Sequence, residues 1–477
     1  MGMRKARPYV NGVWIDDERE STPVLGPYQN ECIGFQLAAD KAEVNEALQA
    51  AHTDKKQMAA LSPAFRAKVL YQAAELLEAR KEEFATLIAR EVGKALKNTR
   101  DEVERSIETL KLSAEEAKRL FGETLPGGAS ERGLSSMALT FRIPVGVVAA
   151  ITPFNAPLNL ICHKIGPSFA AGNVTILKPA PQAPLIAAAL VELLLEAGMP
   201  AQAIHMVLGG KEIGEQLVQD ERVNLVSFTG GVPGGRQISK TAGMKKVLLE
   251  LGGNAGTIVH EDANIERAAA ICAKTGFSNS GQSCISVQRI YVHENVLEAF
   301  VSKLKEHTAA LIVGNPEDEQ TDVGCVVNTQ TAERVRDWLE EAVAEGAELL
   351  YGGKATGASV QPAILYNPKK QSKVVCQEVF GPVVSVLPYR EIDTAIQEVN
   401  DSEFGLQAGI FSNSLEVIRK AAIELEVGGV VVNGSSNFRL DHWPYGGIKN
   451  SGIGREGPRF AAEEMTELKM VVLQDLL

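Results

Sequence analysis

The chain has 477 residues, enough for roughly two to four domains, and 45% of them are hydrophobic, as in an ordinary globular protein. Its 48 basic and 60 acidic side chains give a formal net charge of -12. A surface of that sign repels phosphate backbones and anionic lipids, so we expect neither nucleic acid nor membrane as a partner.

Six cysteines are scattered along the chain without a CxxC pair: Cys32, Cys162, Cys272, Cys284, Cys325 and Cys376. Their spacing argues against a disulfide framework and against structural zinc, and favours a reducing compartment. The basic N-terminal segment is not followed by the apolar stretch that a secretory signal requires. We therefore expect a cytoplasmic protein that holds no metal.

The first half of the chain changes from a helical to an alternating pattern. Residues 42–120 carry apolar side chains at three- and four-residue spacing, which predicts helices. A Gly/Pro-rich break follows at 125–133. Short apolar runs then alternate with helical segments: runs at 145–151, 174–179, 203–210 and 223–231, helices at 184–198 and 211–220. This alternation predicts a parallel sheet with crossover helices.

A second alternating region begins after residue 254. Its strand-like runs are 289–294, 383–389, 405–412 and 428–434, and residues 296–311 have a helical pattern. The chain ends in an apolar, strand-like piece within 463–477. Together with 138–143, that piece is suited to pairing with another subunit.

Two residues stand out as a nucleophile and a base. Cys284 lies in FSNSGQSCISVQR, where small neighbours leave a thiol accessible, although a lone cysteine is more often buried filler. Glu250 ends the apolar run in KKVLLELGGN, directly before two glycines. Burial there would raise its pKa, which suits a general base. The alternative is a strand-end carboxylate paired with a lysine.

Two turns could hold anionic groups. In VSFTGGVPGGRQI, Gly230, Gly231, Gly234 and Gly235 open a helix after a strand, so backbone N–H groups can approach a pyrophosphate. The spacing of these glycines differs from the usual GxGxxG fingerprint of a dinucleotide-binding turn. In AAITPFNAPLN, the Asn155 amide could donate to an oxyanion, or simply bond the backbone of its own turn.

Taken together, these segments resemble the aldehyde dehydrogenase superfamily over nearly the whole chain. The matching pieces occur in the family's order: PVGVVAAITPFNAP, ILKPA, SFTGG, LELGG, GQSC, EVFGPV, FGLQAGIFS and PYGGIKNSGIGREG. Cys284 follows Glu250 by 34 positions (284 − 250), which fits the family. The resemblance implies an α/β protein with a parallel-sheet, Rossmann-type cofactor domain, an α/β catalytic domain and a small β oligomerisation element.

The resemblance also implies domain limits and an assembly. Residues 1–122 and 142–252 would form the cofactor domain, and 253–447 the catalytic domain. Residues 123–141 and 448–477 would be oligomerisation segments. The family usually forms homodimers or homotetramers.

The implied reaction is oxidation of a small aldehyde to its carboxylic acid with NAD or NADP. Cys284 would attack the aldehyde carbon, and the Asn155 amide and the Cys284 N–H would hold the oxyanion. Hydride would pass to the nicotinamide, leaving a thioester. Glu250 would activate the water that hydrolyses it. No metal is required.

The implied cofactor site draws on several motifs. Lys178 would hydrogen-bond the adenosine ribose, and Glu378 the nicotinamide ribose. Gly230 and Gly235 would flank the pyrophosphate. The remaining contacts would come from neighbouring residues: Thr152, Pro153, Phe154, Gly231, Leu251 and Phe380.

Two positions depart from the common family pattern. Pro181 stands where many NAD-specific relatives carry a glutamate that contacts ribose and repels the extra phosphate of NADP. Either cofactor is therefore expected. Gly231 replaces a frequent serine, which weakens one pyrophosphate contact.

Three residues are candidates for the substrate pocket. Arg105, His163 and Arg439 resemble positions in the subgroup of lactaldehyde, phosphonoacetaldehyde and non-phosphorylating glyceraldehyde-3-phosphate dehydrogenases. The last of these carries arginine directly before its nucleophile, where this chain has Ser283. We therefore expect a small aldehyde that is anionic or hydroxylated.

Ordinary ion pairs would explain the two arginines equally well. Arg105 could pair with Asp101, four residues back on its helix. Arg439 could pair with Asp441.

Three other functions remain open on the residues alone. A cofactor-independent thiol hydrolase would use Cys284 with His163 as its base. A non-enzymatic relative would not need the nucleophile and the base. A coenzyme-A-acylating dehydrogenase would form the same thioester, but relatives of that type generally lack the base that Glu250 supplies.

Overall fold

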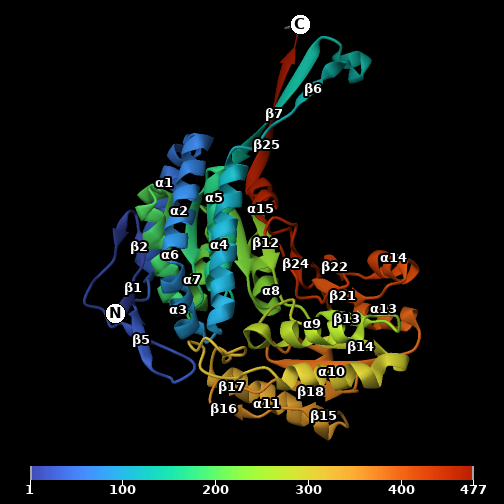
Figure 1. Ribbon diagram of the computed structural model, residues 1–477. Coiled ribbons are helices and arrows are strands. Elements are labelled where there is room, and N and C mark those ends of the chain that lie inside the picture. Colours follow the sequence, from blue (N-terminus) through green and yellow to red (C-terminus); the bar gives the residue numbers. More distant parts are fainter. Residues whose placement is uncertain (1–2, 475–477) are drawn as a thin grey trace.

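The computed structural model describes residues 3–474. It contains two α/β bodies, each built around a mainly parallel sheet, and a three-stranded arm that projects from them (Figure 1). This architecture confirms the predicted fold class. No helix among the described residues is long and apolar enough to cross a bilayer.

The predicted helical region forms four helices of the first body. They are α1 (Lys41–Ala59), α2 (Pro63–Ala79), α3 (Lys81–Val92) and α4 (Leu96–Ala117). Helix α1 begins with a capping box, in which the Asp40 carboxylate accepts from the Glu43 N–H and the Glu43 side chain bonds back. The buried residues of each helix repeat at three- and four-residue spacing, as the pattern predicted.

The first sheet has eight strands. Their order is β24 (Gly452–Ile453), β12 (Lys246–Glu250), β11 (Leu225–Thr229), β8 (Val147–Ile151), β9 (Val174–Lys178), β10 (Ile204–Met206), β2 (Tyr9–Val10) and β3 (Val13–Trp14). The five strands from β12 to β10 run parallel. Their carboxyl ends therefore meet along one edge of the sheet.

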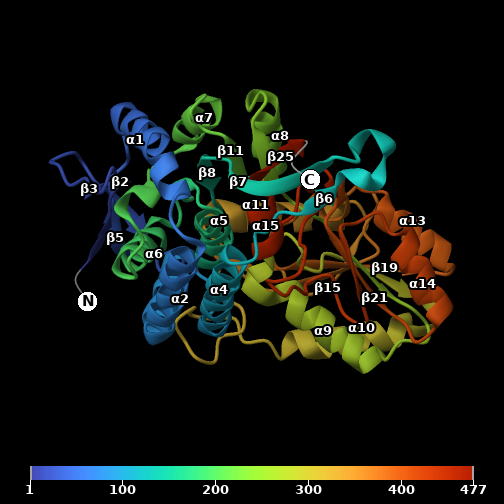
Figure 2. The same ribbon diagram turned by 90° about the horizontal axis from the view of Figure 1, so that it is seen from above.

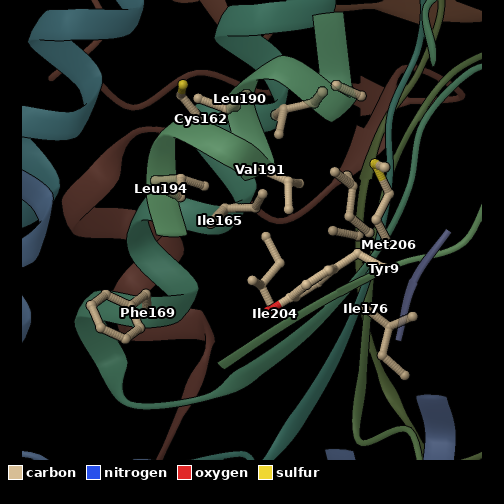
Figure 3. Packing of buried hydrophobic residues seen from close by; sticks show 14 of the residues in the cluster. Tyr9, Cys162, Ile165, Phe169, Ile176, Leu190, Val191, Leu194, Ile204 and Met206 are labelled. Atoms are coloured by element: carbon tan, nitrogen blue, oxygen red, sulfur yellow. The ribbon is translucent and has the colours of Figure 1, made fainter. Parts of the chain in front are cut away.

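Helices cover both faces of this sheet (Figure 2). The crossover helices are α5 (Pro157–Ala171), α6 (Pro184–Glu196), α7 (Lys211–Gln219) and α8 (Val232–Thr241). Figure 3 shows the contact of α5 and α6 with the sheet, where Ile165 and Val191 lie near Ile204 and Phe169 lies further along α5, whereas Ile176 is in register with His205 and points to the opposite face. All five side chains are buried, so the sheet and its helices share one apolar core.

The second body has a seven-stranded sheet. Its order is β15 (Glu348–Tyr351), β18 (Ala363–Tyr366), β19 (Val383–Tyr389), β14 (Arg289–His293), β13 (Gly256–Val259), β21 (Gln407–Phe411) and β22 (Gly429–Val432). Only β15 is antiparallel to its neighbour. The helices are α9 (Ile265–Phe277), α10 (Leu297–Ala309), α11 (Thr329–Ala344), α12 (Lys373–Cys376), α13 (Ile392–Asn400) and α14 (Leu415–Glu424).

Short strands complete the two bodies. Strands β1 (Arg4–Ala6), β5 (Cys32–Gln36) and β4 (Thr22–Leu25) form a three-stranded sheet. Two further pairs are β16 (Ala355–Thr356) with β17 (Ser359–Val360), and β20 (Phe404–Gly405) with β23 (Ile448–Lys449). These edge elements are too short for a periodic signal, and the sequence pattern did not predict them.

The arm consists of β6 (Thr124–Pro126), β7 (Ser136–Pro144) and β25 (Thr466–Gln474). Strands β7 and β25 pair antiparallel over their whole length, within one chain. Of the predicted oligomerisation segment 448–477, only β25 belongs to the arm, because β24 joins the first sheet and α15 (Pro458–Glu464) packs on α4 and α5. Residues 475–477 lie outside the described residues.

A buried carboxylate fixes the start of α5, the helix that follows Asn155. No side chain of its own caps this helix. Instead, Glu102 on α4 accepts from the backbone N–H groups of Leu158 (2.8 Å) and Asn159 (3.3 Å). The Lys94 ammonium lies 2.6 Å from the other Glu102 oxygen. The pair is almost fully buried, so each charge depends on the other.

We predict that Glu102→Ala lowers the free energy of unfolding by roughly 3–5 kcal/mol, because it leaves Lys94 charged, buried and unpaired. Glu104→Ala on the same helix is the matched control. The Glu104 carboxylate is exposed in its ion pair with Lys81, so its loss should cost less than about 1 kcal/mol. Urea unfolding of both variants measures the difference, and equal losses would contradict the assignment.

Candidate active site

The carboxyl edge of the first sheet brings four of the predicted segments together. Glu250 ends β12 and is in register with Thr229, which ends β11. Lys178 ends β9 in register with Ile151 of β8, and the turn that carries Asn155 begins directly after Ile151. This edge is where parallel α/β sheets bind ligands.

A cavity of about 240 Å³ lies at this edge, between the two bodies. Cys284, Glu250 and Asn155 all line it. The other lining residues come from both bodies: Pro153, Phe154, Leu160, Thr229, Gly230, Gly231, Leu251, Gly252, Glu378, Phe380, Arg439, Tyr445 and Glu456. The three residues that the sequence singled out for chemistry therefore face one space.

Glycines make this convergence possible. A Cβ on Gly252 would lie 2.4 Å from a Glu378 oxygen, and a Cβ on Gly253 would lie 2.3 Å from the Cys284 carbonyl oxygen. Gly281 has φ +70°, and a Cβ there would meet the Gly381 backbone at 2.0 Å. The LELGG, GQSC and EVFGPV segments pack against one another through positions where no side chain fits.

Cys284 holds a partly buried thiol. Its Sγ lies 2.8 Å from the Tyr445 hydroxyl, and the apolar side chains of Ile285 and Leu406 pack around it. Burial raises the pKa of Cys284 to about 12, although the bond to Tyr445 acts in the opposite direction. In the ligand-free protein, Cys284 is therefore a thiol at neutral pH.

The Asn155 amide is fixed beside the Cys284 loop. Its Nδ2 donates to the Gln282 carbonyl at 3.0 Å, and the Asn279 amide donates to the Asn155 carbonyl at 2.9 Å. Because an amide nitrogen carries two hydrogens, one N–H of Asn155 remains for a ligand. The position fits a donor to an oxyanion near Cys284.

Two buried carboxylates near the cavity have opposite pKa shifts. Burial, and then the charge of Glu456, raise the pKa of Glu250 well above its usual range. The charges of Arg439 and Lys164 counteract burial, and the pKa of Glu456 is lowered to about 2. The Arg439 guanidinium lies 2.9 Å from Glu456. These environments favour a proton on Glu250 and a negative charge on Glu456.

A second cavity of about 250 Å³ lies beside β9 and α8. Lys178, Pro181, Phe228 and Gly234 are among its lining residues. Burial lowers the pKa of Lys178 to about 8, and its Nζ has the Pro179 carbonyl as a hydrogen-bond partner. The cavity is mostly apolar and has two amines, Lys178 and Lys211, which suits an adenosine.

The segment between the two cavities suits a pyrophosphate. Helix α8 begins after Gly231, and no side chain caps it. The first backbone N–H groups of the helix are therefore available to a ligand. The buried hydroxyls of Thr152 and Thr229 have no hydrogen-bond partner among the described residues. These unmatched donors fit a dinucleotide that spans both cavities.

The remaining predicted cofactor residues lie around the first cavity. The Glu378 carboxylate accepts from the Gly253 N–H at 2.9 Å, and burial raises its pKa to about 7. Phe380 packs edge-on against Phe154, with 5.9 Å between ring centroids. A Cβ on Gly235 would lie 2.5 Å from the Leu251 side chain, so this glycine lets α8 approach β12.

The predicted substrate residues lie in a buried charged cluster. Arg105 forms a two-pronged pair with Asp441 (2.9 and 2.8 Å), not with Asp101 of its own helix. Arg439 lines the first cavity, whereas Arg105 and His163 are not among its lining residues. Arg439 also lies 3.7 Å from Asp441, the partner proposed for it.

His163 lies behind Arg439. It is fully buried, with Nε2 2.8 Å from Asp441 and 3.0 Å from the Arg439 guanidinium. Burial, together with the charge of Arg439, lowers its pKa. His163 is therefore neutral at pH 7 and can reach a ligand only through Arg439.

Three residues of the site were missed by the sequence analysis. Tyr445 and Glu456 line the cavity, and the buried Lys164 ammonium lies 3.5 Å from Glu456. Tyr445 and Glu456 stand inside the quoted segment PYGGIKNSGIGREG, and Lys164 directly follows His163. The only available signal was the segment itself, because nothing in its spacing shows that it folds back onto Cys284.

Comparison with known proteins agrees with this geometry. The profile of the aldehyde dehydrogenase family matches residues 14–471. The chain therefore belongs to the aldehyde dehydrogenase family, whose members oxidise aldehydes. No group of three or more His, Cys, Asp or Glu side chains within 3–474 is placed to hold a metal ion.

Particular relatives share almost the full length. A 3-sulfolactaldehyde dehydrogenase of Priestia aryabhattai is 51% identical over 466 residues, covering 98% of this chain and 97% of the relative. A lactaldehyde dehydrogenase of Methanococcus vannielii is 43% identical, covering 98% and 100%. The structure of glyceraldehyde-3-phosphate dehydrogenase GapN from Methanocaldococcus jannaschii, complexed with NADP, superposes with a TM-score of 0.93 at 39% identity, covering 96% and 100%.

We predict slow alkylation of Cys284 in the ligand-free protein, because its pKa of about 12 leaves little thiolate. The rate should rise about ten-fold per pH unit between about pH 7 and pH 9, without a plateau. Peptide mapping after iodoacetamide treatment measures it, with the exposed Cys376 as the internal reference. A plateau in this range would mean that the site already stabilises the thiolate.

Proposed function

We propose that the protein oxidises a small aldehyde bearing a hydroxyl or anionic group to its carboxylic acid, with NAD or NADP, through a thioester on Cys284. One observation carries this proposal. A thiol, an amide donor and a carboxylate of raised pKa line one cavity, which adjoins a second cavity suited to a dinucleotide.

Each residue has a part in the proposed mechanism. The Cys284 sulfur bonds the aldehyde carbon, and the carbonyl electron pair moves to the oxygen, which the free N–H of Asn155 and the Cys284 N–H stabilise. The bound nicotinamide supplies the hydride acceptor. Glu378 and Phe380 position its ribose and ring. Glu250 then takes a proton from the water that cleaves the thioester.

Two variants test this mechanism. Cys284→Ala should abolish aldehyde oxidation while cofactor binding persists. Glu250→Gln should slow thioester hydrolysis more than hydride transfer, so stopped-flow traces should show a burst of reduced cofactor followed by slow turnover. Cys272→Ala is the matched control, because Cys272 is buried in the core away from the cavity. Substantial oxidation by Cys284→Ala would refute the thioester route.

The geometry favours this function over the other three. A thiol hydrolase would need His163 as a base, but His163 is fully buried and does not line the cavity. The position and raised pKa of Glu250 support water, rather than coenzyme A, as the thioester acceptor. A non-enzymatic protein would have no need for this arrangement.

Both cofactors should be accepted. Pro181 and Lys178 line the adenosine-type cavity together with Lys211, so a 2′-phosphate would meet ammonium groups. Pro181→Glu should shift the preference towards NAD by like-charge repulsion of roughly 1–2 kcal/mol. Kinetics with NAD and NADP in parallel measure the shift. Exclusion of NADP by the unmodified protein would contradict this expectation.

Arg439 is the better candidate for an anionic substrate group. It lines the cavity, and its Nε has no hydrogen-bond partner among the described residues. Arg105 lies one layer further out, held by Asp441. The names of the relatives, sulfolactaldehyde and lactaldehyde dehydrogenase, support a small polar substrate.

We predict that Arg439→Ala lowers the ratio of kcat/KM for succinic semialdehyde to kcat/KM for propanal, at a cost of roughly 1.5–3 kcal/mol for one lost charged hydrogen bond. Arg105→Ala should change the ratio less. A general loss of activity lowers kcat/KM for both aldehydes equally and leaves their ratio unchanged, because both are oxidised by the same steps. If it stays flat in both variants, the arginines serve only the buried ion pairs.

The arm supports a homodimer or homotetramer in the cytoplasm. It extends away from both bodies, and Phe141, Ile143, Leu468 and Met470 on its strands are exposed. Apolar side chains on a projecting sheet are suited to contact with a second chain.

A further inference from the structure

The Tyr445 hydroxyl is the polar group nearest to the proposed nucleophile that the mechanism above does not use. It lies 2.8 Å from Cys284 Sγ and lines the same cavity. The side chain is buried, with 6% of the residue exposed. A new partner can therefore reach this hydroxyl only from within the cavity.

The phenol is fixed from two sides. The Tyr445 N–H donates to the Glu456 carbonyl at 3.0 Å, and the Glu456 N–H donates back at 2.6 Å. The Arg439 guanidinium carbon lies 4.0 Å from the centre of the Tyr445 ring. The hydroxyl consequently cannot turn away from Cys284 without breaking these contacts.

Cys284 Sγ is the one hydrogen-bond partner of the Tyr445 hydroxyl within residues 3–474. In the proposed first step, the S–C bond forms, the carbonyl electron pair moves to oxygen and the thiol proton passes to Glu250, which releases it to solvent before it accepts a proton from water. Either group can be the donor in the Cys284–Tyr445 hydrogen bond, whereas a sulfur bonded to two carbons has no S–H to donate and is only a weak acceptor. The buried hydroxyl therefore loses its acceptor at that moment, and a buried donor without a partner is costly.

The aldehyde has one side left to supply a new acceptor. Its oxygen faces Asn155 and the Cys284 N–H, and its hydrogen faces the cofactor side with Glu378 and Phe380. The carbon next to the aldehyde is then left on the side of Tyr445, Arg439 and Leu160. An oxygen on that carbon would accept from the Tyr445 hydroxyl.

We propose that Tyr445 determines specificity by donating to an oxygen on the carbon adjacent to the aldehyde, which selects 2-hydroxyaldehydes. This inference rests on the proposed function and names its substrate class. In the free protein, the Tyr445 hydroxyl is hydrogen-bonded to Cys284 Sγ. Once the sulfur is bonded to the aldehyde carbon, the substrate oxygen replaces Cys284 as the partner of this hydroxyl.

The test compares lactaldehyde with propanal, which lacks only the 2-hydroxyl, in the unmodified protein and in Tyr445→Phe. The ratio of kcat/KM for lactaldehyde to that for propanal should fall by at least about ten-fold in the variant, the effect of one lost buried hydrogen bond. Tyr389→Phe is the matched control, because that buried hydroxyl lies 3.0 Å from His260 in the second body. It should leave the ratio unchanged.

Each outcome separates the two proposals. Equal losses with both aldehydes would overturn the inference, since Tyr445 would then act on the oxyanion or the thiol. If the unmodified protein oxidises neither aldehyde with either cofactor, the proposed function fails. If Tyr445→Phe is insoluble, kcat/KM of the unmodified protein is measured with lactaldehyde, 3-hydroxypropanal and propanal. The inference requires a higher kcat/KM for lactaldehyde than for both other aldehydes, and the absence of this preference would overturn it.

Discussion

The close approach of the Gly252–Gly253 backbone to the Cys284 loop and to Glu378 holds the site together. A Cβ at either glycine would fall within 2.4 Å of an atom of the second body, a separation that real side chains do not reach. Glu250, at the end of β12, can therefore line the same cavity as Cys284 and Glu378. The strand belongs to one body and the thiol to the other, so these two positions without side chains decide whether a shared site exists.

Burial then determines the chemistry of the groups that meet there. The same low-polarity surroundings raise the pKa of Cys284, Glu250 and Glu378. The pKa of Glu456 is lowered instead, because the Arg439 guanidinium lies beside its carboxylate. The result is one carboxylate whose protonated form is favoured by burial and another that stays charged in an ion pair.

The arginine cluster shows how a charge can be buried in an acidic protein without being lost to function. Arg105 is committed to Asp441 by two hydrogen bonds. Arg439 is shared between Glu456 and the Tyr445 ring and keeps one unpaired N–H. The outer arginine therefore belongs to the cluster alone, whereas the inner one also lines the cavity.

The sequence by itself determined the elements and the chemistry-bearing segments. Strand β12 ends at Glu250 and α10 covers 297–309 as the local patterns indicated, because hydrophobic periodicity is a property of neighbouring residues. Only the tertiary structure decided the partners. Arg105 pairs with Asp441, 336 positions away, rather than with Asp101, and Tyr445 reaches Cys284 from 161 positions away. Such contacts depend on how two separate sheets pack, and no local spacing encodes that packing.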